Sequence, residues 1–295
     1  MATAGQWLEG ARPRTLPAAI APVAVGAGLA AWYEAFDPLL SLLALLVAIA
    51  LQVGVNYAND YSDGIRGTDR VRVGPVRLVG QELAAPRAVK AAAFACFGAA
   101  AVAGVVLVGL SGQWWLLLVG AASIAAAWLY TGGPRPYGYA GLGEVFVFVF
   151  FGLVPVLGTV YVQVLGIGLA DVVAAVGVGL LACAILVTNN LRDIPSDTDA
   201  GKRTLAVRIG DRGTRALYFA MVAIAVILPL GVGALTTAWA MLAAFTGILA
   251  NRPIRIVVSG ASGPALIPAL KLTGLLLLVY GLALAGLLAL GSLLR

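Results

Sequence analysis

Long apolar runs separated by short polar breaks make up most of this sequence. About 20 apolar residues cross a hydrocarbon core of roughly 30 Å, so any much longer run is divided at a break. The pattern predicts one domain, residues 1–295, with two polar segments near 58–87 and 191–213 that are long enough to form a cap. The nine transmembrane helices expected lie near 16–32 and 39–57, two within 88–130, two within 142–190, two within 216–250, and one near 266–290.

The composition supports a membrane protein, since 61% of the 295 residues are hydrophobic and only 11% are charged. A soluble domain carries about 25% charged residues, so we expect an all-α integral membrane protein surrounded by lipid, with no nucleic-acid partner. Histidine is absent from the sequence, which removes the commonest general base and metal ligand. Cys96 and Cys183 lie in different apolar runs and indicate neither a disulfide framework nor a metal knuckle.

Basic residues gather in alternate breaks between the apolar runs. The opposite breaks contain Glu34, Asp37 and Asp171 and no Lys or Arg. Because cytoplasmic loops hold most Lys and Arg, we expect the N-terminus in the cytoplasm and the C-terminal Arg295 outside. Frequent Ala, Val and Arg indicate a bacterial source, so the expected location is the bacterial plasma membrane.

Two polar stretches repeat one spacing at the cytoplasmic ends of apolar runs. Residues 56–64 read Asn-Tyr-Ala-Asn-Asp-Tyr-Ser-Asp-Gly, and residues 189–199 read Asn-Asn-Leu-Arg-Asp-Ile-Pro-Ser-Asp-Thr-Asp. Helix positions four apart share a face, so each Asn-x3-Asp set points to one side if its helix continues through the stretch. Pro195 is expected to bend or restart the second helix. The repeated spacing is a short internal echo that places similar side chains in two halves of the chain.

Several carboxylates at one membrane face repel one another unless cations lie between them. Hard oxygen ligands suit Mg²⁺, which takes one or two carboxylates together with substrate phosphates. Since basic residues follow each stretch, the two stretches predict a clamp for magnesium and a diphosphate. The alternative is that the Asp residues only solvate helix ends. It fits less well, because carboxylates at membrane depth are costly and usually functional.

Topology alone explains most of the cytoplasmic arginines. Position favours three basic residues as phosphate contacts, because Lys202 and Arg203 follow the second stretch and Arg135 lies in a tight turn. Arg72 and Arg77 stay undecided. Aromatic residues near the same face fit either an interfacial belt or a surface that faces a carbocation.

These motifs resemble the UbiA-type intramembrane prenyltransferases, and within them the 1,4-dihydroxy-2-naphthoate polyprenyltransferases of menaquinone synthesis. The resemblance covers nearly the whole chain. It rests on Arg-Pro-Arg-Thr-Leu-Pro at 12–17, the stretches at 56–64 and 189–206, Tyr-Thr-Gly-Gly-Pro-Arg-Pro-Tyr-Gly-Tyr at 130–139, and Gly-Leu-Gly-Glu at 141–144. The Asp-rich stretches mark the superfamily, and the last two motifs are similar to those of the naphthoate branch.

The resemblance implies a nine-helix bundle around a central cavity. It implies transfer of a polyprenyl group from polyprenyl diphosphate to 1,4-dihydroxy-2-naphthoate, with loss of CO2, to give demethylmenaquinone. Two Mg²⁺ ions would bridge the diphosphate. The expected catalytic residues are Asp60, Asp63, Asp193, Asp197 and Lys202, and the four Asp are also the expected metal ligands. The residues expected to bind diphosphate or substrate are Asn56, Asn59, Arg135, Asn189, Arg203, Tyr130 and Tyr137.

One position departs from the family pattern Asn-Asp-x2-Asp-x3-Asp. Gly67 stands where the last carboxylate is expected, and Asp69, two residues later, is a further candidate metal ligand. This departure affects the first stretch only.

Other interpretations stay open. A related prenyltransferase would use another aromatic acceptor such as 4-hydroxybenzoate, or haem. A phosphatidyl transferase expects an Asp-Gly-x2-Ala-Arg tract, which residues 63–66 do not complete. A secondary transporter would place its acids near the middle of the membrane, whereas here they lie at helix ends.

Overall fold

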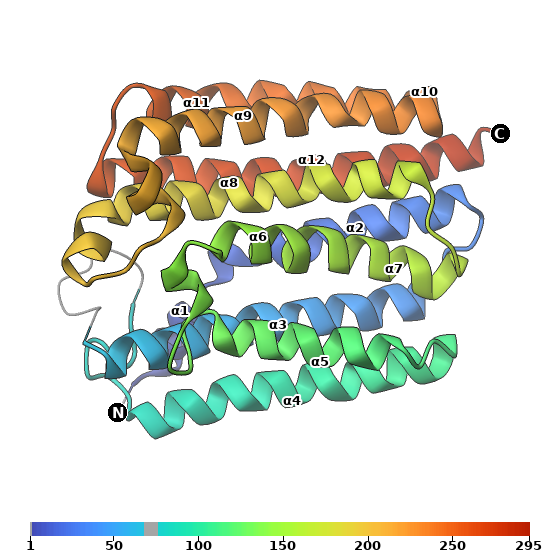
Figure 1. Cartoon of the computed structure of the whole chain (residues 1–295). Coiled ribbons are helices and arrows are strands. Elements are labelled where there is room, and N and C mark those ends of the chain that lie inside the picture. Colours follow the sequence, from blue (N-terminus) through green and yellow to red (C-terminus); the bar gives the residue numbers. More distant parts are fainter. Residues whose placement is uncertain (1, 68–75) are drawn as a thin grey trace.

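The computed structural model describes residues 2–67 and 76–295, and in these residues it contains helices and turns but no strands (Figure 1). The elements in chain order are α1 (Ala4–Gly10), η1 (Pro13–Thr15), α2 (Pro17–Trp32), α3 (Pro38–Ile65), α4 (Pro86–Ser111), α5 (Leu116–Leu129), η2 (Tyr137–Ala140), α6 (Gly143–Val147), η3 (Phe148–Leu153), α7 (Val154–Val164), α8 (Leu169–Asp199), α9 (Leu205–Leu235), α10 (Ala238–Met241), η4 (Leu242–Ala250), α11 (Asn251–Val258), η5 (Gly263–Leu266) and α12 (Ile267–Leu293).

The all-helical membrane architecture is confirmed. Within the described part of the chain, 7 helices are long and apolar enough to cross a membrane, or up to 8 if the bent pair Ala4–Thr15 and Pro17–Trp32 forms one span. The apolar helix α5 has only 14 residues, which gives about 21 Å at 1.5 Å per residue, less than a core of roughly 30 Å. The count of nine spans therefore stays a prediction.

The helices that carry the two polar stretches extend beyond the ends that hydropathy predicts. α3 continues to Ile65 rather than stopping near 57, and α8 continues to Asp199 rather than near 190. Hydropathy shows where polarity begins, whereas the backbone hydrogen bonds of the helix continue into the polar residues. α8 also runs through Pro195 without the restart that its sequence suggests. Both helices end at the same end of the bundle as the N-terminus (Figure 1).

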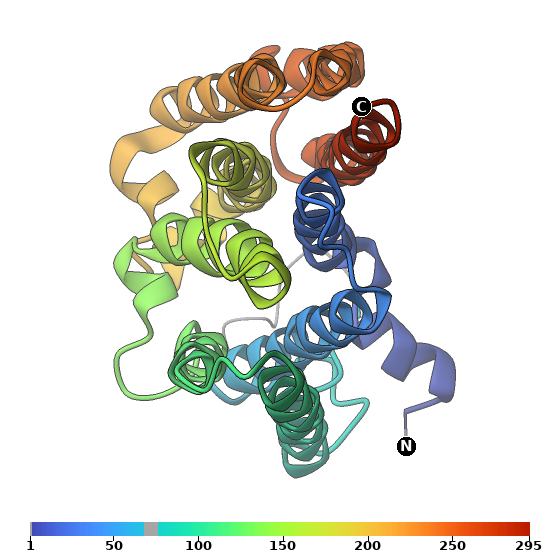
Figure 2. The same cartoon turned by 90° about the vertical axis from the view of Figure 1, so that its right-hand side faces the viewer.

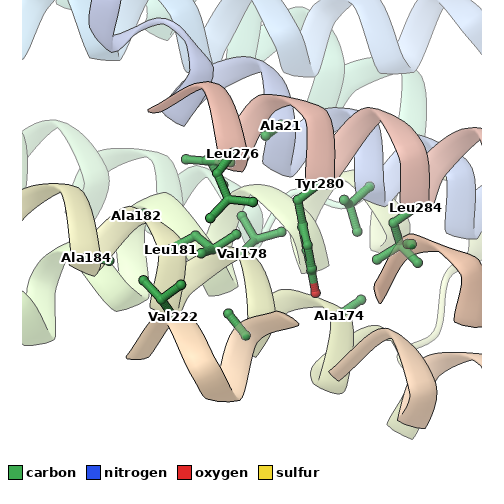
Figure 3. Close-up of a cluster of buried hydrophobic side chains, with 14 of the residues drawn as sticks. Ala21, Ala174, Val178, Leu181, Ala182, Ala184, Val222, Leu276, Tyr280 and Leu284 are labelled. Atoms are coloured by element: carbon green, nitrogen blue, oxygen red, sulfur yellow. The ribbon is translucent and has the colours of Figure 1, made fainter. Parts of the chain in front are cut away.

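Small residues allow the helices to pack closely around α8. Val178 of α8 and Tyr280 of α12 are both fully buried in the main core (Figure 3). A Cβ on Gly177 would lie 2.3 Å from the Tyr280 hydroxyl, and a Cβ on Gly28 would lie 2.4 Å from the Ala285 Cα. Glycine at these two positions therefore sets how near α12 approaches α8 and α2, as is common for helices that pack in lipid.

Viewed end-on, α8 lies among α2, α9 and α12, and α4 and α5 lie at the other side of the bundle (Figure 2). The N-terminus and the C-terminus lie at opposite ends of the bundle (Figure 1). This arrangement is compatible with the expected topology, in which the two termini lie on opposite sides of the membrane.

Candidate active site

A cavity of about 1100 Å³ lies among the helices. Its volume is slightly above the roughly 300–1,000 Å³ that small-molecule sites occupy. Apolar residues from α4 and α5, such as Val108 and Ile124, line one part of it. The charged and amide side chains contributed by the two polar stretches and their neighbours include Asn56, Asn59, Asp63, Arg77, Asn189, Asn190, Arg192, Asp197 and Lys202.

Asn56, Asp60 and Asp63 of the first polar stretch share one face of α3, because the helix continues through all three. The members of the stretch nevertheless have different partners. Asn56 donates from Nδ2 to the Ala11 carbonyl at 2.9 Å and to Thr15 Oγ1 at 3.0 Å, which ties the N-terminal segment to α3. Asn59 accepts a hydrogen bond from Thr131 Oγ1 at 2.7 Å. The stretch therefore anchors two other segments as well as facing the cavity.

Asp60 is 1% exposed and does not line the cavity. Its carboxylate accepts hydrogen bonds from the backbone N–H groups of Leu78 at 2.6 Å and Val79 at 3.2 Å. These bonds position the segment that carries Arg77, whose guanidinium lies 4.0 Å from Asp63. In this structure Asp60 therefore influences the cavity by positioning Arg77 and not by direct contact.

Lys202 lies between carboxylates from the two polar stretches. Its Nζ is 3.5 Å from Asp63 Oδ1 and 3.7 Å from Asp197 Oδ1, and all three side chains are buried. Opposite charges at these distances stabilise each other strongly where water is scarce. The ammonium group therefore joins the end of α3 to the end of α8 at the cavity wall.

The end of α8 explains why Lys202 points back to Asp197. Gly201 has φ of 72°, the left-handed conformation that favours glycine after a helix. The Lys202 N–H donates to the Asp197 carbonyl at 2.8 Å and the Gly201 N–H donates to the Thr198 carbonyl at 3.0 Å. This pair of bonds is the Schellman motif, and it reverses the chain so that Lys202 folds over the last turn of α8.

Tyr139 completes this cluster from a different part of the chain. Its hydroxyl donates to Asp63, and its ring centroid lies 4.5 Å from Lys202 Nζ. Its carbonyl accepts from the Arg203 N–H at 2.9 Å. Burial, together with the neighbouring Asp63 carboxylate, raises the pKa of the Tyr139 hydroxyl above its ordinary value. The hydroxyl therefore stays protonated and remains a donor.

Asp193 is paired within its own helix. Arg192 donates to it from Nε at 2.7 Å and from Nη2 at 2.8 Å, and the same Nη2 donates to Asn189 Oδ1 at 2.9 Å. Asp193 does not line the cavity, whereas Arg192 and Asn189 do. The carboxylate therefore orients a guanidinium that faces the cavity.

The structure separates the remaining expected residues. Tyr130 and Tyr137 line the cavity, with ring centroids 5.5 Å apart. Arg135 and Arg203 are exposed and do not line it. Asp69 lies outside the described residues, as does Arg72.

Four further residues line the cavity although the motifs did not single them out as site residues: Arg77, Tyr139, Asn190 and Arg192. Arg192 had a usable signal, because it lies inside the Asn-x3-Asp spacing of the second stretch. Arg77 lies in the predicted cap segment near 58–87 and Tyr139 ends the 130–139 motif, and only tertiary packing shows that both approach Asp63.

The oxygen donors fit a cation that is shared with substrate phosphates. Asp63 and Asp197 approach the same ammonium group from α3 and α8, and the carboxamides of Asn59 and Asn189 also line the cavity. Within residues 2–67 and 76–295 there is no group of three or more His, Cys, Asp or Glu that could hold a metal by itself. Mg²⁺ commonly takes one or two carboxylates and completes its shell with phosphate and water, which matches this donor set.

The fold and the site define a class: a helical membrane protein with a charged, amide-rich site at the wall of a largely apolar cavity. Within that class, the chain belongs to the UbiA prenyltransferase family, whose model matches residues 19–259. It is 56% identical over 293 residues to a Mycobacterium tuberculosis protein named 1,4-dihydroxy-2-naphthoate octaprenyltransferase, covering 99% of this chain and 100% of the relative. A protein of the same name from Escherichia coli is 44% identical over 215 residues, covering 71% and 70% of the two chains.

Solved structures support the fold. A UbiA homologue from Archaeoglobus fulgidus bound to GPP and Mg²⁺ has a TM-score of 0.68 and 17% identity, covering 95% of this chain and 99% of that chain. The apo structure of a UbiA homologue from Aeropyrum pernix K1 has a TM-score of 0.72 and 17% identity, covering 91% and 96%. The expected UbiA-like architecture is therefore confirmed.

Proposed function

We propose that this protein transfers a polyprenyl group from polyprenyl diphosphate to 1,4-dihydroxy-2-naphthoate, with loss of CO2, giving demethylmenaquinone in its reduced form. The observation that carries the proposal is the buried cluster of Asp63, Lys202 and Asp197 at the wall of a cavity that is otherwise mostly apolar. A diphosphate with a long prenyl tail has the same division into charged head and apolar body. The 56% identity to the mycobacterial relative over nearly the full chain favours the naphthoate acceptor.

The basic side chains of the cluster would bind the leaving diphosphate. Lys202, Arg77 and Arg192 all line the cavity, and the first two lie within 4.0 Å of the Asp63 carboxylate. Preorganised positive charge in a water-poor site stabilises the negative charge that develops as the allylic C–O bond breaks. These residues therefore favour ionisation of the prenyl donor.

Asp63 and Asp197, with the amide oxygens of Asn59 and Asn189, would hold Mg²⁺, and we infer that two ions would bind there together with the diphosphate. Bound Mg²⁺ supplies Lewis-acid neutralisation of the phosphate oxygens. Asp60 and Asp193 have a positioning role in this scheme, because the first orients the Arg77 segment and the second orients Arg192. This assignment differs from a scheme in which all four Asp bind metal directly.

The apolar lining from α4, α5 and α7 would exclude water from the allyl cation. Exclusion matters because water would capture the cation before the aromatic ring attacks. We place the protein in the bacterial plasma membrane with its N-terminus and site on the cytoplasmic side. The polar ends of α3 and α8 support this orientation, since they lie at the same end of the bundle as the N-terminus (Figure 1).

The test is turnover by the purified protein in lipid nanodiscs with 1,4-dihydroxy-2-naphthoate, a polyprenyl diphosphate and MgCl2. We expect demethylmenaquinone by chromatography, an equal amount of CO2, and loss of both products when EDTA replaces MgCl2. Prenylation of 4-hydroxybenzoate with no product from the naphthoate would contradict the acceptor assignment and keep the prenyl transfer. Absence of transfer to either ring would reject both.

A further inference from the structure

Glu144 is a buried carboxylate that the scheme above does not use. It lies in the first turn of α6, is 6% exposed and does not line the cavity. Its Oε1 accepts a hydrogen bond from Asn190 Nδ2 at 3.0 Å, and among the described residues its Oε2 has no hydrogen-bond partner. Carboxylates are seldom buried in a membrane protein without a function, so the contact with Asn190 is informative.

Asn190 connects this carboxylate to the cavity. It is 7% exposed, belongs to α8 and lines the cavity. An ionised carboxylate is an acceptor only, and a primary amide has a donor side and an acceptor side. Because the NH2 group of Asn190 is turned toward Glu144, its Oδ1 is left as the acceptor. Glu144 therefore determines which half of the Asn190 amide is available to a ligand.

Aromatic side chains also line the cavity that Asn190 lines. Tyr137 stacks on Phe146 with ring centroids 3.8 Å apart and an interplanar angle of 21°, and Phe146 stacks on Phe150 at 6.0 Å and 23°. Phe146 follows Glu144 by two residues on α6, and Phe150 lies on η3. All three aromatic residues line the same cavity as Asn190. The cavity therefore offers a flat aromatic ligand both ring contacts and an amide acceptor.

We propose that Asn190 Oδ1 accepts a hydrogen bond from a ring hydroxyl of the aromatic acceptor, and that Glu144 is the positioning residue that orients this amide. The inference rests on the proposed function, because it assigns the acceptor subsite of the same reaction. A hydrogen bond accepted from the hydroxyl raises the electron density of the ring. It also orients the ring toward the allyl cation that forms beside the Asp63 and Lys202 cluster.

The reaction at this subsite balances without an oxidant. The C–O bond of the prenyl donor breaks and its electron pair leaves with the diphosphate. A new C–C bond then forms between the allyl carbon and the ring carbon that bears the carboxylate. The bond from that carbon to the carboxylate breaks, CO2 leaves, and the electron pair returns to the ring as the aromatic quinol.

Glu144→Gln tests the orienting role with little change in volume. A Gln at this position can donate to Asn190 Oδ1, which would turn the amide and remove the acceptor from the cavity. We expect the KM for the naphthoate to rise about tenfold, as for a lost hydrogen bond worth roughly 1.4 kcal/mol, and the KM for polyprenyl diphosphate to change less than about twofold. Asn190→Leu should give the same pattern. The double variant should be no worse than Asn190→Leu alone, because both changes act through one amide.

Asp171→Asn is the matched control. Asp171 is a fully buried carboxylate in the first turn of α8, the helix that carries Asn190 near its other end. Its Oδ2 accepts from the Gly168 N–H at 2.6 Å, and it does not line the cavity. The same loss of charge there should leave both KM values unchanged. If the Asp171 and Glu144 variants behave alike, or if Glu144→Gln raises both KM values together, the inference is wrong and Glu144 is only structural.

Binding of the naphthoate alone, measured by calorimetry on the full-length protein in nanodiscs, separates this inference from the proposed function. We expect about tenfold weaker binding to Glu144→Gln than to the unmodified protein. Equal affinity would overturn the inference even if turnover is observed. Weaker binding by the variant would support the subsite even if no prenylated product forms, in which case the proposed function alone would fail. Asn190→Ser gives the same comparison if Glu144→Gln does not accumulate in the membrane.

Discussion

Lys202→Met removes the one ammonium group that joins Asp63 to Asp197 while keeping most of the side-chain volume. At 3.5 and 3.7 Å, each attraction is about 4–5 kcal/mol with an effective dielectric constant near 20. The desolvation of Lys202 offsets much of this energy. Removing one partner of a buried ion pair typically costs about 3–5 kcal/mol, because a charge is left without compensation. Here two buried carboxylates from different helices would face each other.

Two consequences follow from this charge imbalance. Without Mg²⁺, Lys202→Met should lower the melting temperature by several degrees, because 1 kcal/mol corresponds to roughly 2–4 °C in a protein of comparable size. Mg²⁺ should raise the melting temperature of Lys202→Met more than that of the unmodified protein, since the cation would compensate the two carboxylates that have lost their ammonium partner. The KM for polyprenyl diphosphate should rise at least about tenfold, because a phosphate contact is lost.

The assay is thermal unfolding followed by tryptophan fluorescence in detergent, with EDTA or MgCl2, together with steady-state kinetics in nanodiscs. Lys90→Met is the control, because Lys90 is exposed on α4 and its ammonium lies over the rings of Tyr61, Phe94 and Trp128. It should change neither the KM for polyprenyl diphosphate nor the response to Mg²⁺. An unchanged KM and an unchanged Mg²⁺ response for Lys202→Met would refute the bridging role.

Four further substitutions separate the roles assigned above. Asp60→Ala should lose turnover and also lower the melting temperature, because two buried backbone N–H groups lose their acceptor. Asp197→Asn should lose turnover with a smaller change in melting temperature. Equal decreases in melting temperature for the two variants would contradict the distinction between their roles. Arg192→Lys should reduce kcat/KM at least about tenfold, since a lysine cannot bind Asp193 through two nitrogen atoms, and wild-type kinetics would show that the pair is dispensable. Tyr139→Phe should lower activity by a constant factor from pH 6 to about 9, because burial raises the pKa of Tyr139 and the hydroxyl stays protonated throughout. A titration step in the pH profile of the unmodified protein that is absent from that of the variant would be the contrary result.

Hydropathy was sufficient to predict the architecture, because each membrane span must satisfy its own backbone hydrogen bonds and therefore must be an apolar helix. It was not sufficient for the helix ends. α3 and α8 continue through the polar stretches to Ile65 and Asp199, since intrahelical hydrogen bonds do not require apolar side chains. The same continuation is what places the paired Asn and Asp residues on one face of each helix.

The sequence by itself determined the membrane class, the two polar stretches and their Asn-x3-Asp spacing, because these depend on composition and local order. Only the tertiary structure decided which equivalent side chains face the cavity. Asp60 and Asp63 are three residues apart on one helix, yet the first accepts from the backbone of 78–79 and the second meets Lys202. Lys202 and Arg203 are adjacent, yet the turn at Gly201 brings only the first inward. The partners that make these choices come from segments distant in sequence, and no local period records where such segments pack.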